Sequence, residues 1–247
     1  SAEALASRAP EVLGKHYEIT YPGRQWHSAR GLCTLPLHAS WVREKAHFGQ
    51  VFGFERPMYF QKQGEPKLGF GKPDWFNQVG REVSCATNDV AIFDQSSFGK
   101  ISITGRDAES MLNRLCANNM SRPAGRATYT TMVNEKGGIE SDLTSLRFDD
   151  ESYRLYVGSS AIKRDLAWLR DHVNANEQVE IRDHTIQFAT IAVMGPKASV
   201  MMRSLGADWL DTLGYFTHAR NEIAGIMVDA VRLSYVGEAG WELTCAC

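Results

Sequence analysis

Hydrophobic and polar residues alternate with two different periods along this chain, and the periods predict its elements. Apolar residues three or four positions apart predict helices over about 1–15, 76–87, 107–116, 160–172 and 196–205. Ser160 is expected to cap the fourth of these helices, and Pro196 to occupy the first turn of the fifth. Period-two alternation predicts strands within 100–104, 127–144, 153–157, 178–182, 190–193, 218–223 and 228–235. Helices mixed with mostly hairpin-linked, antiparallel strands predict an α+β fold.

The N-terminal quarter lacks this regularity. Residues 16–60 hold four of the seven histidines and few periodic runs, and residues 61–75 are rich in Gly, Lys and Pro, which is typical of an exposed loop. We therefore expect residues 1–60 to be a linker or tail that follows a preceding region, and residues 61–247 to form one domain. The histidines have no metal-ligand spacing, so no metal site is expected.

Composition narrows the class of function. The 247 residues carry 27 basic and 29 acidic side chains, and a net charge of −2 gives no general basic field for nucleic acid. Five scattered cysteines in a chain of this size predict free thiols. No apolar run is long enough to span a membrane, so a membrane partner is not expected. The sequence stops inside the strand-like stretch 241–247, and we expect it to be a piece of a longer protein.

Two segments carry the candidate chemistry. In residues 127–144, two strands flank a turn marked by Asn134, Gly137 and Gly138, and Asp142 stands on the second strand. A rigid hairpin holds such a carboxylate at a fixed depth. In residues 233–243, Glu238 lies between glycines, where a carboxylate can project from a tight turn.

These two segments resemble the aminomethyltransferase (glycine cleavage T-protein) family, whose members bind tetrahydrofolate. Upstream stretches resemble the region that joins the flavin domain to the folate domain in dimethylglycine and sarcosine dehydrogenases. The further segments that carry the likeness are Phe93–Ser97, Met194–Pro196, His16–Gln25, Pro36–His38 and Gly53–Pro57. The resemblance implies a folate-binding fold that stops before the family's C-terminal β-barrel. It places FAD only in a preceding domain that this sequence lacks, because no dinucleotide-binding glycine motif opens the chain.

The resemblance also assigns roles. Asp142 is the catalytic carboxylate, beside which the chain has Ser141 where many members have a second aspartate. Glu238 is expected to accept the paired N–H groups of the pterin, with Glu242 as the less favoured substitute. The remaining expected cofactor contacts are Tyr129, Tyr235, Met132 and Asn134.

The function implied is capture of an iminium, at the oxidation level of formaldehyde, as 5,10-methylene-tetrahydrofolate. The iminium would come from oxidative N-demethylation in a flavin domain, in the bacterial cytoplasm or the mitochondrial matrix. Two alternatives stay open: a non-catalytic regulatory homologue, similar to the pyruvate dehydrogenase phosphatase regulatory subunit, and a stand-alone aminomethyltransferase. Retention of Asp142 and Glu238 argues against the first, and the flavoprotein-like residues 16–60 argue against the second.

Overall fold

The computed structural model describes residues 1–60 and 67–247, which form two compact units, Ser1–Cys85 (unit 1) and Ala86–Cys247 (unit 2). The sequence-based boundary between residues 60 and 61 stays a prediction. Residues 61–66 of the expected loop lie outside the described residues.

Unit 1 contains more regular structure than the sequence pattern predicts. Glu55 explains why the pattern conceals it: this charged residue in a strand is buried, and the Arg30 guanidinium neutralises it through a 2.8 Å bond from Nε to Oε1. A buried charge is tolerated when it is paired in this way. The elements of unit 1 are α1 (Ala2–Lys15), α2 (His38–Arg43), the antiparallel pair β1 (Ala46–Val51) and β2 (Phe54–Phe60), and the larger part of α3 (Phe76–Asn88).

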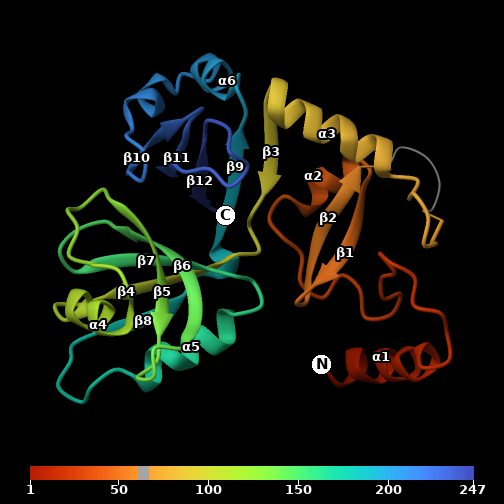
Figure 1. Ribbon diagram of the computed structural model, residues 1–247, viewed down its shortest axis with the longest axis horizontal. Helices are drawn as coiled ribbons and strands as arrows, with labels where there is room; N and C mark the ends of the chain where they lie inside the picture. Colours follow the sequence, from red (N-terminus) through yellow and green to blue (C-terminus); the bar gives the residue numbers. More distant parts are fainter. Residues whose placement is uncertain (61–66) are drawn as a thin grey trace. The chain divides into compact units, whose positions relative to one another are not determined.

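Unit 2 is built on two five-stranded antiparallel sheets, so the expected α+β class is confirmed (Figure 1). The β5 sheet has the order β5-β6-β7-β4-β8. Its strands are β5 (Ala127–Val133), β6 (Ile139–Arg147), β7 (Ser152–Val157), β4 (Gly99–Thr104) and β8 (Glu180–Asp183). The β10 sheet has the order β10-β11-β12-β9-β3. Its strands are β10 (His218–Ile223), β11 (Ile226–Val231), β12 (Gly240–Ala246), β9 (Phe188–Met194) and β3 (Ala91–Asp94).

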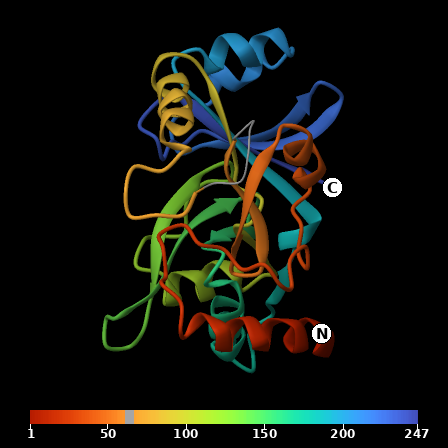
Figure 2. The ribbon, with the colours of Figure 1, turned by 90° about the vertical axis from the view of Figure 1, so that its right-hand side faces the viewer.

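Helices cover the outer face of each sheet. On the β5 sheet, Ser141 of β6 donates a 2.7 Å hydrogen bond to the buried Asp165 of α5. On the β10 sheet, Trp241 and Leu243 of β12 share one apolar core with residues of α6 and η2. Unit 2 is therefore layered as helix, sheet, sheet and helix, which can be followed from α6 to α5 in Figure 2. The helical elements of unit 2 are α4 (Ala108–Leu115), α5 (Ile162–Asp171), α6 (Ala198–Ser204), η1 (Thr185–Gln187) and η2 (Asp208–Thr212).

The inner faces of the two sheets meet through both apolar and polar contacts. Arg154 of β7 donates a 2.7 Å bond to Asp229 of β11, and the Tyr156 hydroxyl donates a 2.9 Å bond to Thr244 of β12. An apolar cluster beside these bonds joins Ala127, Leu146, Val231 and Leu233. Polar residues on the inner faces are therefore held in fixed places between the sheets.

Three local predictions are wrong. The helix expected to begin at Ser160 is capped by Ala161 without a side-chain bond, since its first turn closes from Asp165 N to Ala161 O. Pro196 precedes the cap of α6, because the Lys197 N–H is bound to Asp89 O and the helix begins only after it. The strand expected over 228–235 ends at Val231, where the pairing of β11 with β12 stops.

Within the part of the chain that the structure describes, no helix combines the length and the apolar character that crossing a bilayer requires.

Candidate functional site

A row of polar side chains crosses the inner face of the β5 sheet. Tyr129 of β5 is the register partner of Thr144 on β6, and Thr144 is the partner of Tyr156 on β7. Asp142 lies two residues before Thr144 and hence on the same face. Leu143, between them, is buried on the opposite, helix-covered face. Strand alternation thus turns Asp142 toward the β10 sheet.

Tyr129 and Asp142 form a hydrogen-bonded pair. The Tyr129 hydroxyl donates to Asp142 Oδ2 over 3.2 Å, and this bond to a carboxylate raises the pKa of the phenol. Asp142 is exposed, and Tyr129 keeps 47% of its surface exposed. A carboxylate and an aromatic ring are therefore open to a ligand at the same point.

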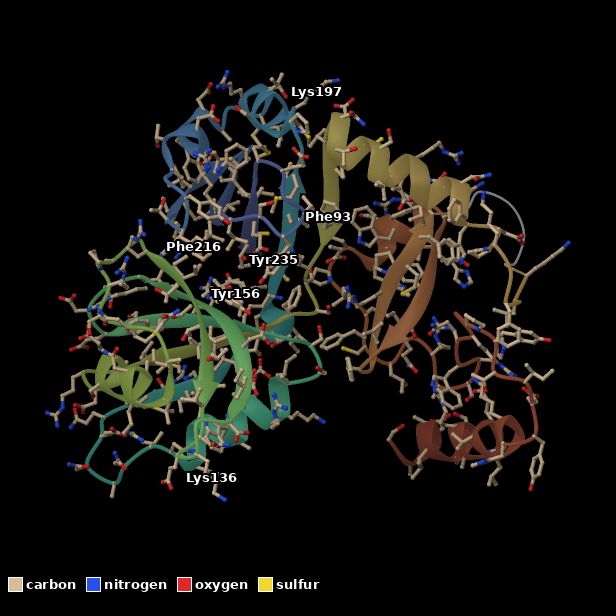
Figure 3. All side chains as sticks on the ribbon, viewed as in Figure 1. Phe93, Lys136, Tyr156, Lys197, Phe216 and Tyr235 are labelled. Carbon is tan, nitrogen blue, oxygen red and sulfur yellow. The ribbon has the colours of Figure 1, made fainter. Side chains whose placement is uncertain are left out.

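Tyr235 joins this pair to the other sheet. It stands in the loop 232–239 between β11 and β12, and its hydroxyl is hydrogen-bonded to Thr144. Partial burial raises the pKa of this phenol, and the negative charges of Glu242 and Asp142 raise it further. Tyr235 therefore lies within the electrostatic reach of both carboxylates. Figure 3 shows its side chain near that of Tyr156, where the two sheets meet.

Glu242 is the second carboxylate of the cluster. It lies on β12 between Trp241 and Leu243, whose side chains enter the outer core, so its own side chain takes the inner face. Only 8% of its surface is exposed. Burial raises the pKa of its carboxyl to about 7, against a lowering contribution from its hydrogen bond with Gln95. Sequence reasoning ranked this residue below Glu238; the alternation around Trp241 was the pattern that could have found it.

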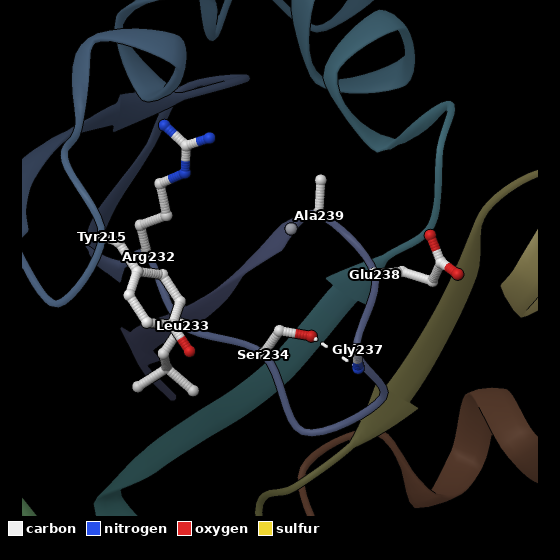
Figure 4. A pocket seen from close by; sticks show the side chains of 8 residues that line it. Tyr215, Arg232, Leu233, Ser234, Gly237, Glu238 and Ala239 are labelled. Atoms are coloured by element: carbon white, nitrogen blue, oxygen red, sulfur yellow. Dashed lines mark hydrogen bonds between the residues drawn. The ribbon is translucent and has the colours of Figure 1, made fainter.

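Glu238 lines a separate cavity of about 330 Å³ at the β11–β12 loop. Figure 4 shows its carboxylate on the far side of the loop from the Arg232 guanidinium. Neither Asp142 nor Tyr235 is among the residues that line this cavity. The lining consists of Tyr215, Arg232, Leu233, Ser234, Gly237, Glu238, Ala239 and Gly240. The pterin-binding role of Glu238 stays a prediction.

Met132 and Asn134 have structural partners. Met132 is 0% exposed and pairs with Ser141, on the helix-covered side of the β5 sheet. Asn134 fixes the hairpin turn, because its Oδ1 accepts bonds of 3.0 Å from Lys136 N and 2.9 Å from Gly138 N. Their expected part in cofactor binding stays a prediction.

The cluster is defined by what its members share: each faces the space between the two sheets and offers either a ring or a carboxyl group. We call it the inter-sheet cluster, and its members are Tyr129, Asp142, Tyr235 and Glu242. The two carboxyl groups differ in surroundings, since Asp142 is exposed and Glu242 buried. In such a pair the exposed group can act as a base and the buried group as a hydrogen-bonding anchor.

A protein-family model described as "GCVT N-terminal domain" matches residues 37–247. The chain belongs to this family. The match includes every member of the inter-sheet cluster, so the resemblance inferred from the sequence is confirmed at the level of the family.

Curated relatives are longer than this chain. The formaldehyde-forming 4-methylaminobutanoate oxidase of Paenarthrobacter nicotinovorans is 32% identical over 244 residues, which cover 97% of this chain and 30% of that protein. The mitochondrial dimethylglycine dehydrogenase of Rattus norvegicus is 30% identical over 238 residues, covering 94% of this chain and 27% of that protein. The chain thus spans less than a third of either relative.

A solved structure supports the fold. The glycine cleavage system aminomethyltransferase T of Bartonella henselae superposes with a TM-score of 0.73 at 21% identity, covering 87% of this chain and 54% of that chain. At this identity the likeness establishes the architecture, and it confirms the expected aminomethyltransferase-like fold.

Proposed function

We propose that this chain is the tetrahydrofolate-binding region of an N-methyl amine oxidase or dehydrogenase, and that it captures the released one-carbon unit as 5,10-methylene-tetrahydrofolate. The single observation that carries the proposal is the inter-sheet cluster. It places an exposed Asp142 and a buried Glu242 on facing sheets, with Tyr235 within reach of both. The formaldehyde-forming relative supports the oxidation level of the carbon.

The residues present fit a reduced pterin. Its pyrimidinone ring is flat and carries adjacent N–H donors on one edge. Tyr129 and Tyr235 are both more than 40% exposed, at 47% and 68%, so their rings can pack against such a plane. A buried carboxylate is the partner that binds two parallel N–H groups well, and Glu242 supplies one on the inner face. We therefore assign pterin recognition to Glu242 in this proposal, with Glu238 as the competing assignment.

Tetrahydrofolate, when bound, supplies two amine nitrogens, N5 and N10, that take up a carbon at the formaldehyde level. Ring closure at N10 releases one proton, and the amine that carried the carbon leaves. Asp142 would accept that proton, because its exposed carboxylate is already oriented by the hydrogen bond from the Tyr129 hydroxyl. Tyr129 would keep Asp142 in place during the transfer.

The test uses the full-length protein that contains this chain. N-methyl amines such as dimethylglycine and sarcosine are oxidised with and without tetrahydrofolate, and rapid quenching separates free formaldehyde from methylene-tetrahydrofolate. We expect added tetrahydrofolate to divert most of the carbon from formaldehyde to the folate product, faster than free formaldehyde condenses with folate in a protein-free control.

Other outcomes decide between the alternatives. Carbon that stays as formaldehyde at saturating tetrahydrofolate would contradict the proposal. Lack of both amine oxidation and folate binding would favour a regulatory homologue. Methylene transfer from an aminomethyl-lipoyl carrier without amine oxidation would favour a stand-alone aminomethyltransferase.

A further inference from the structure

Gln95 belongs to a loop that is held in place by several hydrogen bonds. Its N–H donates a 2.9 Å bond to Thr190 O on β9. The next residue, Ser96, donates from its N–H to Asp94 Oδ1 over 2.9 Å and accepts at Oγ from Thr190 N over 3.1 Å. The fully buried Lys100 donates from Nζ to Ser96 O over 2.7 Å. The main chain on both sides of the Gln95 side chain is therefore anchored.

The anchored loop lies beside β9, the strand next to β12. Thr190, which binds Gln95, is the register partner of Thr244, and Glu242 stands two residues before Thr244 on the same face. The Gln95 amide reaches this face and forms a side-chain hydrogen bond with the Glu242 carboxyl. The two immediate strand partners of Glu242 are Ala192 and Val231, and neither offers a side-chain donor.

Several polar groups on the elements packed against β12 have partners other than Glu242. On β7, Arg154 is bound to Asp229 and Tyr156 to Thr244. On β4, Lys100 is bound to Ser96 O, and in the preceding loop Tyr235 is bound to Thr144. Gln95 is the residue whose side chain is hydrogen-bonded to the Glu242 carboxyl.

We propose that Gln95 is a positioning residue, which fixes the Glu242 carboxyl toward the pterin edge. This inference rests on the proposed function, because it presumes that Glu242 is the pterin anchor. The Gln95 amide N–H donates to a Glu242 oxygen, and this bond restricts the rotamer of Glu242 and stabilises its charged form more than its neutral form. The hydrogen bond from Gln95 lowers the pKa of Glu242, as expected of a bond that stabilises the charged carboxylate.

Removal of the donor should therefore change the pH profile of binding rather than affinity alone. Gln95→Met keeps the length of the side chain and removes the amide. In the full-length protein we expect the midpoint of tetrahydrofolate affinity against pH to move up by about one unit, since a bond to a charged group has that size. Affinity at pH 7 should fall about fivefold, and affinity above the new midpoint should approach that of wild type.

A readout without folate separates this inference from the proposed function. Infrared difference spectra of wild type minus Glu242→Gln isolate the protonation of Glu242 as a function of pH. The carboxylic-acid band should persist to higher pH in Gln95→Met than in wild type. In the Glu242→Gln background, Gln95→Met should leave the pH profile of affinity unchanged, because the coupled group is gone.

The outcomes are distinct. If wild type binds tetrahydrofolate and Glu242 titrates at the same pH in wild type and in Gln95→Met, only the positioning role of Gln95 is overturned. Wild type that does not bind tetrahydrofolate overturns the proposed function and this inference with it. Gln95→Asn, which draws the amide back by one methylene, replaces Gln95→Met if that variant fails to fold, and it should shift the titration in the same direction.

Discussion

Asp142 and Glu242 are two carboxylates set in different surroundings by the same rule, the alternation of side chains along a strand. Leu143 enters the core under α5, so Asp142 faces inward between the sheets; Trp241 and Leu243 enter the core under α6, so Glu242 does the same. One carboxylate meets solvent and the other is buried. At the scale of single residues, the proposed chemistry depends on this difference.

The first prediction separates binding from proton transfer at Asp142. Asp142→Asn keeps the shape and one acceptor oxygen but cannot take the N10 proton near neutral pH. We expect most tetrahydrofolate affinity to remain in the full-length protein, while methylene transfer falls by about 10²–10⁴-fold, the usual contribution of a placed general base. Product partitioning under excess tetrahydrofolate measures this, with flavin-dependent amine oxidation as the internal control.

Tyr129→Phe is the matched variant for this experiment, because it removes only the hydroxyl that donates to Asp142. Its effect should be smaller than that of Asp142→Asn. If Asp142→Asn partitions carbon as wild type does, Asp142 is structural and the catalytic assignment is wrong.

The second prediction decides between Glu242 and Glu238 as the pterin anchor. Glu242→Gln should weaken tetrahydrofolate binding by roughly 1.5–3 kcal/mol, because a bidentate charged contact becomes a single neutral one. Glu238→Gln should change it by less than about 0.5 kcal/mol, as for an ordinary surface substitution. Titration calorimetry on the two full-length variants gives both numbers. If Glu238→Gln weakens binding more than Glu242→Gln does, Glu238 is the pterin anchor, as the sequence predicted.

At the scale of elements, the place of Glu242 depends on how β12 enters its sheet. Gly240 opens this strand opposite Met194, and a Cβ at this position would lie 2.2 Å from Val193 O. No side chain fits there without moving the backbone of β9. Glycine at this position therefore allows β12 to approach β9 closely enough for Glu242 to pack.

The third prediction tests this close approach. Gly240→Ala should destabilise the protein by about 1–3 kcal/mol, the usual cost of overpacking, and should weaken tetrahydrofolate binding as β12 shifts. Gly158→Ala is the control, because nothing lies within 4 Å of a Cβ at that position. Urea unfolding of both variants provides the comparison; equal midpoints would show that β12 adapts without cost.

Helices and strands were predictable from the sequence where the apolar periodicity was strong. The functional side chains that share one face of a sheet were harder to predict. The hairpin at 127–144 and the helices near 107–116 and 160–172 are present, because their apolar spacing matches their buried faces. The β1–β2 pair was missed because Glu55, a buried charge, breaks the alternation, and only its partner Arg30 makes that acceptable. The hydrogen bond between Gln95 and Glu242 joins a residue of the loop after β3 to a residue of β12, which no local pattern can reveal.

At the scale of the whole molecule, unit 2 assembles its site between two sheets that are closed by helices on their outer faces. The strands that carry Asp142 and Glu242 belong to different sheets, and Arg154–Asp229 and Tyr156–Thr244 hold those sheets together. A polar interface costs stability compared with an apolar one, unless every buried group is paired. Burial raises the pKa of the Glu242 carboxyl to about 7, which is one sign of this cost.

The last prediction concerns that cost. The pKa of Glu242 is raised from 4.5 to about 7 by burial, so the folded state holds a proton that the unfolded chain releases between these values. Its favourable contribution is complete below pH 4.5 and is lost as pH rises through 7. Glu242→Gln carries a neutral amide at every pH. Relative to that variant, wild type should therefore lose up to about 3 kcal/mol of unfolding free energy between pH 4.5 and about pH 8.

Urea unfolding of both proteins across this pH range gives the difference curve, in which titrations common to both proteins, such as that of Lys100, cancel. Saturating tetrahydrofolate should reduce the slope for wild type, because the ligand pairs with the ionised carboxylate and lowers its pKa. A difference curve that is flat without ligand would mean that Glu242 titrates near its unfolded value and is not the buried, ligand-ready carboxylate that the inter-sheet cluster requires.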